Sequence, residues 1–191
     1  MHAERHKEIV DVALNLIFKK GIQGLTIKNL SEKIGITEPA IYRHFDNKTH
    51  ILITIIDFFK ESNEQIYCNE TNSNSSIEKI DFLFHKYFTT FSKKPSLTSV
   101  IFSEEIFRNE PILIEKISKI IRNNDKILTE LIMTGQKSGE LRTDIEAKFL
   151  ATVLMGSLRL CVKKWQLSDY SYNLLEESNK LQKSIKLLIV K

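Results

Sequence analysis

The chain has 191 residues, of which 42% are hydrophobic and 27% charged, so it can form one large or two small soluble domains around a sizeable core. Only six glycines and three prolines occur, which favours long helices, and the absence of a run of about eighteen apolar residues excludes a membrane span. The net charge of +4 permits binding to nucleic acid without establishing it.

The first predicted helix covers residues 3–20. Its apolar residues Val10, Ala13, Leu14 and Ile17 recur at helical spacing and form one buried stripe. Gly21 follows at the position where a helix commonly ends in a left-handed residue. We expect this helix to cover the core made by the next two.

Residues 26–34 and 38–45 are predicted to form two short helices joined by a tight turn. Thr26 and Thr37 stand where N-caps belong, since a hydroxyl there can accept from an amide of the first turn. Gly35 follows the last periodic residue of the first helix, where a left-handed conformation favours glycine. This arrangement is a helix-turn-helix.

The second of these helices has distinct faces. At helical periodicity Ile41 and Phe45 point inward, Arg43 points outward, and Tyr42 and His44 lie on the flanks. This suits a helix in a major groove, with the arginine toward base edges and the flanks toward phosphates. The candidate DNA contacts lie at the start of the first helix, on the outward side and flanks of the second and at the start of the next: Thr26, Lys28, Thr37, Glu38, Pro39, Ala40, Tyr42, Arg43, His44 and Lys48.

The same stretch carries a recurrent pattern of residues. It consists of Thr26, Leu30, Ser31, Gly35, Ile36, Thr37, Ile41, Tyr42, His44, Phe45 and Lys48. This pattern resembles the TetR family of bacterial repressors, with one departure at Ser31, where alanine is more usual. The resemblance implies an all-α protein of about nine helices, with a three-helix DNA-binding domain in residues 1–48 and a ligand-binding and dimerisation domain in residues 49–191.

Helices are also predicted over residues 48–68, 77–91, 97–107, 112–138, 145–166 and 172–190, and no strand is predicted. The first half of the helix over 48–68 is apolar nearly all round, so we expect it to touch both domains and to link them mechanically. A core helix without a switching role is the alternative. Asp144 is expected to cap the helix that begins at residue 145.

Aromatic residues concentrate after residue 50 and are candidates for lining an apolar cavity. Aromatic residues at helical spacing also build ordinary cores, but the resemblance favours a site for a small hydrophobic effector. The candidates are Phe59, Phe84, Tyr87, Phe88, Phe91, Phe102, Phe107, Met133, Met155 and Cys161, with His85, Glu104 and Arg108 as further polar contacts.

The last two helices carry apolar stripes beyond what one enclosed core requires. Gly156 and Ser157 would allow a partner helix to approach closely, although such a stripe fits packing within one chain equally well. The resemblance implies a homodimer through a four-helix bundle, which would read two half-sites of a palindromic operator. The candidate dimer contacts are Val153, Gly156, Ser157, Leu160, Leu174, Leu181, Ile185 and Leu188.

Sequence motifs for catalysis are missing. There is no glycine-rich phosphate loop and no pair of metal ligands at a recognisable spacing, so we expect no enzyme, no cofactor and no metal. Cys68 and Cys161 are far apart and are expected to be reduced thiols, which together with the polar N-terminus predicts a cytoplasmic protein. The alternative to a DNA-binding regulator is an all-helical protein-interaction module that binds no DNA.

Overall fold

The computed structural model describes residues 2–68, 75–103, 107 and 110–190. Regular structure in these ranges is helical, with no strand, and Leu141 and Val190 form an isolated antiparallel bridge. The predicted all-α fold is therefore confirmed. None of the described helices combines the length and the apolar character needed to cross a membrane.

The chain divides into two compact units, and neither is continuous in sequence. The first comprises residues 1–61 and 96–118, and the second comprises residues 62–95 and 119–191. The predicted boundary after residue 48 concerns function and remains a prediction. Two helices, α4 (Lys48–Cys68) and α8 (Pro111–Lys137), contribute residues to both units.

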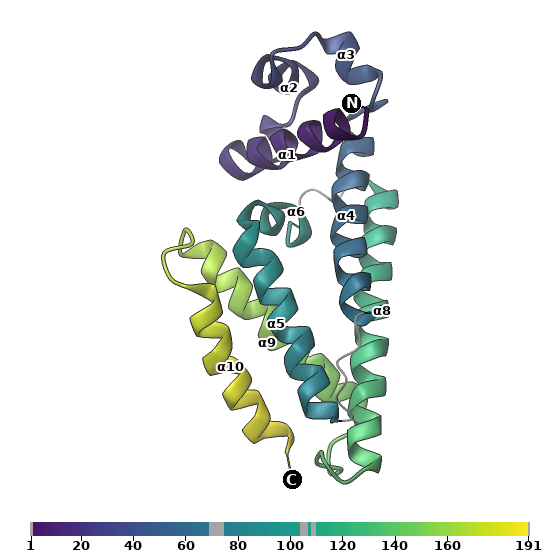
Figure 1. Ribbon diagram of the computed structural model, residues 1–191, viewed down its shortest axis with the longest axis vertical. Helices are drawn as coiled ribbons and strands as arrows, with labels where there is room; N and C mark the ends of the chain where they lie inside the picture. Colours follow the sequence, from purple (N-terminus) through teal and green to yellow (C-terminus); the bar gives the residue numbers. More distant parts are fainter. Residues whose placement is uncertain (1, 69–74, 104–106, 108–109, 191) are drawn as a thin grey trace. The chain divides into compact units, whose positions relative to one another are not determined.

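The first unit is built on a three-helix layer that Figure 1 shows as α1, α2 and α3. Its elements are α1 (His2–Lys20), the 3₁₀ turn η1 (Ile22–Gly24), α2 (Ile27–Ile34), α3 (Glu38–Tyr42), the first part of α4, α6 (Thr98–Ile101) and the first turns of α8. Helix α1 packs against η1, α2 and α6. Fully buried side chains fill this unit: Ile9, Leu14, Ile17, Leu25, Leu30, Ile41, Phe45, Ile51, Ile55 and Ile56.

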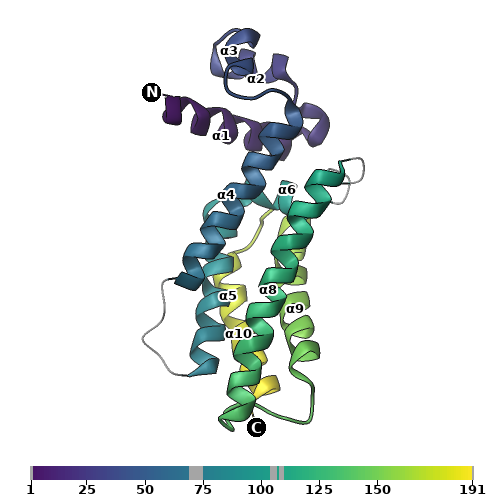
Figure 2. The same ribbon diagram turned by 90° about the vertical axis from the view of Figure 1, so that its right-hand side faces the viewer.

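The second unit is built from long helices. They are the end of α4, α5 (Ser76–Lys93), most of α8, α9 (Ala147–Leu167) and α10 (Leu174–Ile189). The short turn η2 (Pro95–Leu97) follows α5, and the boundary between the two units falls within it. Helices α5 and α10 run side by side in opposite directions (Figures 1 and 2). An ion pair between Asp81 and Lys186 joins them.

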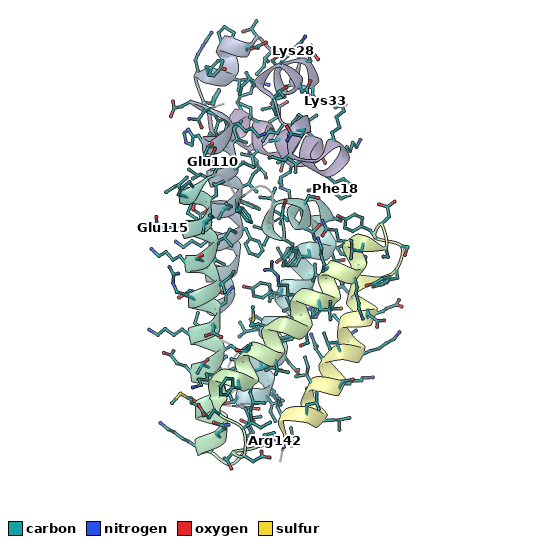
Figure 3. The ribbon with its side chains drawn as sticks, turned by 180° about the vertical axis from the view of Figure 1, so that it is seen from behind. Phe18, Lys28, Lys33, Glu110, Glu115 and Arg142 are labelled. Carbon is teal, nitrogen blue, oxygen red and sulfur yellow. The ribbon has the colours of Figure 1, made fainter. Side chains whose placement is uncertain are left out.

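The loop after α8 forms hydrogen bonds to the start of α5 and to the end of α10. The carboxylate of Glu140 accepts hydrogen bonds from the hydroxyl of Ser75 and, at 2.7 Å, from the N–H of Ser76, and it thereby covers the first turn of α5. The N–H of Arg142 donates to the carbonyl of Ile189 at 2.9 Å, at the end of α10 (Figure 3). This loop therefore holds the α5 and α10 termini together.

Three predicted helix boundaries are wrong. Helix α3 ends at Tyr42 rather than residue 45, and α6 ends at Ile101, where the prediction continued to Phe107 across residues 104–106, which lie outside the described residues. Asp144 does not cap α9. The guanidinium of Arg142 binds the Asp144 carboxylate at 2.6 Å instead, and Glu146 occupies the N-cap without a side-chain hydrogen bond.

Candidate nucleic-acid interface and effector region

The start of α2 is fixed by its own cap and by the turn before it. Thr26 has an extended backbone, and its hydroxyl oxygen accepts the N–H of Asn29 at 3.0 Å, so the predicted cap is confirmed. The side-chain amide of Asn29 in turn donates to the carbonyl of Gly24 at 2.9 Å. The cap and this second bond tie the first turn of α2 to η1.

The turn between α2 and α3 is a left-handed helix ending. Gly35 has φ 78° and ψ 36°, and the N–H groups of Gly35 and Ile36 both donate to the carbonyl of Ser31, at 2.9 and 3.0 Å. This confirms the predicted role of the glycine. Ser31 is buried and its hydroxyl donates to the carbonyl of Lys28 at 2.9 Å, so a serine fits where alanine is more usual.

Helix α3 is short, but the chain continues to turn beyond it. Thr37 occupies the N-cap with its backbone, and its hydroxyl makes no capping hydrogen bond. After the helix ends, the N–H groups of His44 and Phe45 both donate to the carbonyl of Ile41, at 2.9 and 3.0 Å. Ile41 and Phe45 are completely buried, which confirms them as the inward anchors.

The predicted outward residues reach solvent. Tyr42 is 51% exposed, and Arg43 is exposed beside it. His44 is only half-buried, with its Nδ1 atom enclosed. Lys28 lies on the outside of α2 (Figure 3). Of the remaining predicted contacts, four are exposed: Thr26, Thr37, Glu38 and Pro39. Ala40 and Lys48 are half-buried.

The ring of Phe45 is enclosed by two histidines from other helices. His6 of α1 stacks on it with 4.3 Å between ring centroids, and His50 of α4 meets it edge-on at 5.3 Å. The Nδ1 atom of His50 lies 3.3 Å from the carboxylate of Asp46. Phe45, which follows α3, thus contacts the first part of α1 and the first turn of α4.

Lys48 does not point freely into solvent. Its ammonium donates to the carbonyl of Ile22 in η1 at 2.9 Å. Burial lowers the pKa of Lys48, and the charge of Glu110 acts in the opposite direction. Further along α4, the carboxylate of Asp57 accepts two hydrogen bonds from Lys116 of α8, at 2.7 and 2.8 Å.

The predicted effector contacts are distributed over both units. Phe59, Phe102 and Phe107 belong to the first, and the rest belong to the second. On α5 the buried residues form one face: Phe84, Tyr87, Phe88 and Phe91. Met155 and Cys161 are half-buried, and burial raises the pKa of the Cys161 thiol. Glu104 and Arg108 lie outside the described residues.

Two residues of α8 bear on the predicted effector region. Met133 is 44% exposed, and its predicted contact with an effector remains untested. Asn124 was not predicted, although it is buried and its side-chain amide donates to the hydroxyl of Tyr87. Its sequence signal is its spacing: it lies four residues after Ile120 and four before Leu128, on the buried face of α8.

The predicted dimer contacts separate into exposed and enclosed residues. Val153 and Leu160 are 57% and 56% exposed on α9, and the space around Gly156 is open. Leu188 is also exposed, while Ser157 and Leu181 are half-buried. Leu174 and Ile185 are buried within the single chain, and their predicted place in a dimer interface remains untested.

Two family models together match nearly the whole chain. Residues 9–55 match the bacterial regulatory proteins of the tetR family, and residues 55–191 match the C-terminal region of the YsiA-like proteins. The first match covers the helix-turn-helix. The second covers more than half of the chain.

Individual relatives agree with these matches. The chain is 23% identical to the fatty acid metabolism regulator protein of Bacillus subtilis, over 92% of this chain and 90% of that protein. Its fold matches the fatty acid degradation regulator FadR of Bacillus halodurans with a TM-score of 0.82, at 19% identity over 95% and 94% of the two chains. It also matches FadR of Bacillus subtilis in complex with stearoyl-CoA, with a TM-score of 0.79, at 22% identity over 94% and 96%.

The matched family and the named relatives are regulatory proteins, and one of the solved structures is a transcriptional regulator in complex with stearoyl-CoA. The helix-turn-helix described above, with its confirmed caps and buried anchors, is the part of this chain that fits that activity. The chain belongs to the TetR family of bacterial transcriptional regulators.

Proposed function

We propose that two copies of this chain repress transcription from a palindromic operator and leave it when a small hydrophobic molecule binds. The observation that carries the DNA-binding part is the presentation of α3. Tyr42 and Arg43 are exposed over the two fully buried anchors Ile41 and Phe45. A side chain held in this way can reach a groove without rearranging the helix that carries it.

The roles within the interface follow from the chemistry of each side chain. The guanidinium of Arg43 would read base edges, since arginine pairs in a bidentate manner with guanine. Thr26, Tyr42 and His44 would donate to phosphates, which fix orientation without reading sequence. The other contacts proposed at the groove are Lys28, Thr37, Glu38, Pro39 and Ala40.

The exposed apolar stripe of α9 supports the proposed dimer. Val153 and Leu160 lie seven residues apart on one side of the helix, with Gly156 between them. A partner helix would cover these residues and remove their surface from water. In a two-fold dimer the two recognition helices would occupy half-sites about 34–36 Å apart or a multiple of that distance.

The effector proposed for this chain carries a long apolar chain. The phenylalanine-rich face of α5 supports such a ligand, and so does the solved complex of Bacillus subtilis FadR with stearoyl-CoA. The link to DNA would be α4, which contributes residues to both compact units. An effector that binds one arrangement of α4 better than the other would shift the population away from the operator-binding state.

The DNA-binding part is tested by two substitutions on a duplex that the wild-type protein selects from a randomised library. Arg43→Ala is expected to lose about 1–3 kcal/mol of discrimination between the selected and an unrelated duplex. Lys28→Ala should weaken both duplexes alike and flatten the salt dependence. A protein partner recovered without DNA at low and at high salt would instead support the interaction module.

The effector part is tested by adding stearoyl-CoA to the protein–DNA complex, with coenzyme A alone as the control. Release of the duplex by stearoyl-CoA and not by coenzyme A is the expected result. Equal behaviour of the two compounds would contradict an effector that is recognised by its apolar chain.

A further inference from the structure

The loop between α8 and α9 is held in one conformation by contacts to the end of α8. Leu141 is completely buried, and a Cβ atom at Gly135 would lie 2.7 Å from its side chain. The side-chain amide of Gln136 donates to the carbonyls of Arg142 and Ile145, at 2.8 Å each. The backbone on either side of Arg142 is therefore fixed by packing within the second unit.

The end of α10 takes two hydrogen bonds from one residue of this loop. The last four carbonyls of an α-helix have no partner within the helix. After α10, Val190 has an extended backbone, with φ −75° and ψ 152°, rather than the left-handed conformation that commonly closes a helix. The N–H of Arg142 donates to the carbonyl of Ile189 at 2.9 Å, and its guanidinium donates to the carbonyl of Leu188 at 3.1 Å (Figure 3). Arg142 therefore satisfies two of the last carbonyls of α10.

The guanidinium of Arg142 is itself oriented by a carboxylate. Its Nε and Nη2 atoms donate to the two oxygens of Asp144, at 2.7 and 2.6 Å. A planar guanidinium that binds a carboxylate through two parallel bonds has its plane and direction fixed. The remaining nitrogen, Nη1, is the one that binds the carbonyl of Leu188. Asp144 therefore orients the group that holds the last turn of α10.

That last turn carries an exposed apolar side chain. Leu188 is 56% exposed and is one of the predicted dimer contacts. Helices α9 and α10 pack against each other and lie on one side of the second unit (Figure 3). On α9, Val153 and Leu160 are exposed to a similar degree. A helix end that is already ordered before association loses less conformational freedom when a partner covers it, so it binds more tightly.

We propose that Arg142 is a positioning residue for the dimer: oriented by Asp144, it fixes the last turn of α10 and presents Leu188 to a second copy of this chain. The proposal rests on the proposed homodimer. Arg142 acts on association through α10, from a loop that precedes α9. In a two-fold dimer the bond from Arg142 to Leu188 occurs once in each copy, so its loss counts twice.

The first test compares dimer dissociation constants by sedimentation equilibrium for the wild-type protein, Arg142→Met and, as a matched exposed arginine on α8, Arg122→Met. Arg142→Met keeps the backbone bond to Ile189 and is expected to raise the constant about tenfold. Arg142→Lys, which keeps a charged donor without the planar fork, should raise it about threefold. Arg122→Met should leave it unchanged. Wild-type dissociation of both Arg142 variants, or an equal effect of Arg122→Met, would overturn the proposal.

A double-mutant cycle gives a result that a merely structural arginine would not give. Leu188→Ala removes the side chain that Arg142 presents and should weaken the dimer by itself. In the Leu188→Ala background, Arg142→Met should raise the dissociation constant by no more than about twofold, because both changes act on one contact. Equal effects of Arg142→Met in the two backgrounds would show that it does not act through Leu188 and would overturn the proposal.

Hydrogen exchange separates this proposal from the proposed function. The N–H of Val190 donates to the carbonyl of Lys186 at 3.0 Å and closes the last turn of α10. At a protein concentration that gives both proteins the same oligomeric state, its exchange should accelerate about tenfold in Arg142→Met, with exchange in the middle of α8 unchanged. Unchanged exchange at Val190 would overturn the positioning role. A wild-type protein that stays monomeric would instead overturn the proposed homodimer, with the exchange result still standing.

Discussion

The proposed recognition helix α3 and helix α5, which belongs to the proposed effector region, are held in place in opposite ways. Helix α3 has 5 residues and α5 has 18. A helix as short as α3 has no stability of its own, because forming its first turn costs more than its few hydrogen bonds return. Its conformation therefore depends on the two buried anchors at its end, Ile41 and Phe45.

Helix α5 distributes its burial along a whole face. The residues that share this face are Ser76, Ile80, Leu83, Phe84, Tyr87, Phe88 and Phe91. When one of these side chains is truncated, the others on the same face are expected to remain buried. The difference predicts that loss of one anchor disorders the whole of α3, whereas loss of one side chain from α5 leaves the rest of its buried face in place.

The largest effect is expected for Phe45→Ala. Removing this buried ring should cost about 3–5 kcal/mol and remove the hydrogen-exchange protection of α3 together with operator binding. Phe88→Ala removes the same ring from α5 and should cost a comparable amount, measured by urea unfolding, without loss of protection in α3. If Phe88→Ala exposes α3 to exchange as strongly as Phe45→Ala does, the two regions are not independent and the comparison fails.

A smaller effect is expected at the buried hydrogen bond between Tyr87 and Asn124. Asn124→Leu removes the amide donor to the Tyr87 hydroxyl and should cost about 1–3 kcal/mol. Tyr87→Phe should cost a similar amount, and the double variant should cost less than the sum of the two. Additive losses in the urea unfolding of the double variant would show that this pair does not act as a unit.

The two threonines of the helix-turn-helix sharpen the comparison within the first unit. Thr26 caps α2 with its side chain, so Thr26→Ala should lower the free energy of unfolding by about 1 kcal/mol. Thr37 makes no such bond, so Thr37→Ala should leave stability nearly unchanged and affect operator binding alone. Thermal unfolding of both variants measures the difference, and equal destabilisation would show that Thr37 also caps its helix.

The smallest effect concerns pH, because the start of α5 is held by the carboxylate of Glu140 in addition to the hydroxyl of Ser75, whereas α2 has the hydroxyl of Thr26. Desolvation acts to raise the pKa of Glu140, but the hydrogen bonds from Ser75 and Ser76 outweigh it, and the pKa is lowered. A lowered pKa in the folded state gives stabilisation that is present at neutral pH and lost as the acid protonates. The stability of the wild-type protein should therefore fall more steeply than that of Glu140→Gln between about pH 5 and pH 3. Parallel profiles in chemical unfolding would contradict this role of Glu140.

The sequence predicts best where the determining contacts are local. The Thr26 cap, the left-handed Gly35 and the burial of Ile41 and Phe45 each follow from residues a few positions apart, and all are confirmed. For α10 the spacing correctly predicts one apolar stripe. The spacing alone does not predict which helix packs against that stripe. Part of the stripe, including Leu174, is buried within the single chain.

Contacts between distant residues account for most of what sequence reasoning missed. The bond from Lys48 to Ile22 and the pairing of Asn124 with Tyr87 depend on the tertiary arrangement. Asp144 satisfied the local rule for a helix cap, yet the nearby guanidinium of Arg142 competes successfully for its carboxylate.

The division of the chain into two discontinuous units has a consequence for synthesis on the ribosome. The first unit needs residues 96–118, which emerge after the whole of residues 62–95 of the second unit has been made. The bond from Lys116 to Asp57 cannot form until that later segment appears. Domains generally fold as units while the chain is being made. Here the first unit remains incomplete until translation is well past the helix-turn-helix, so an expressed fragment that stops after residue 61 would lack part of the core of this unit.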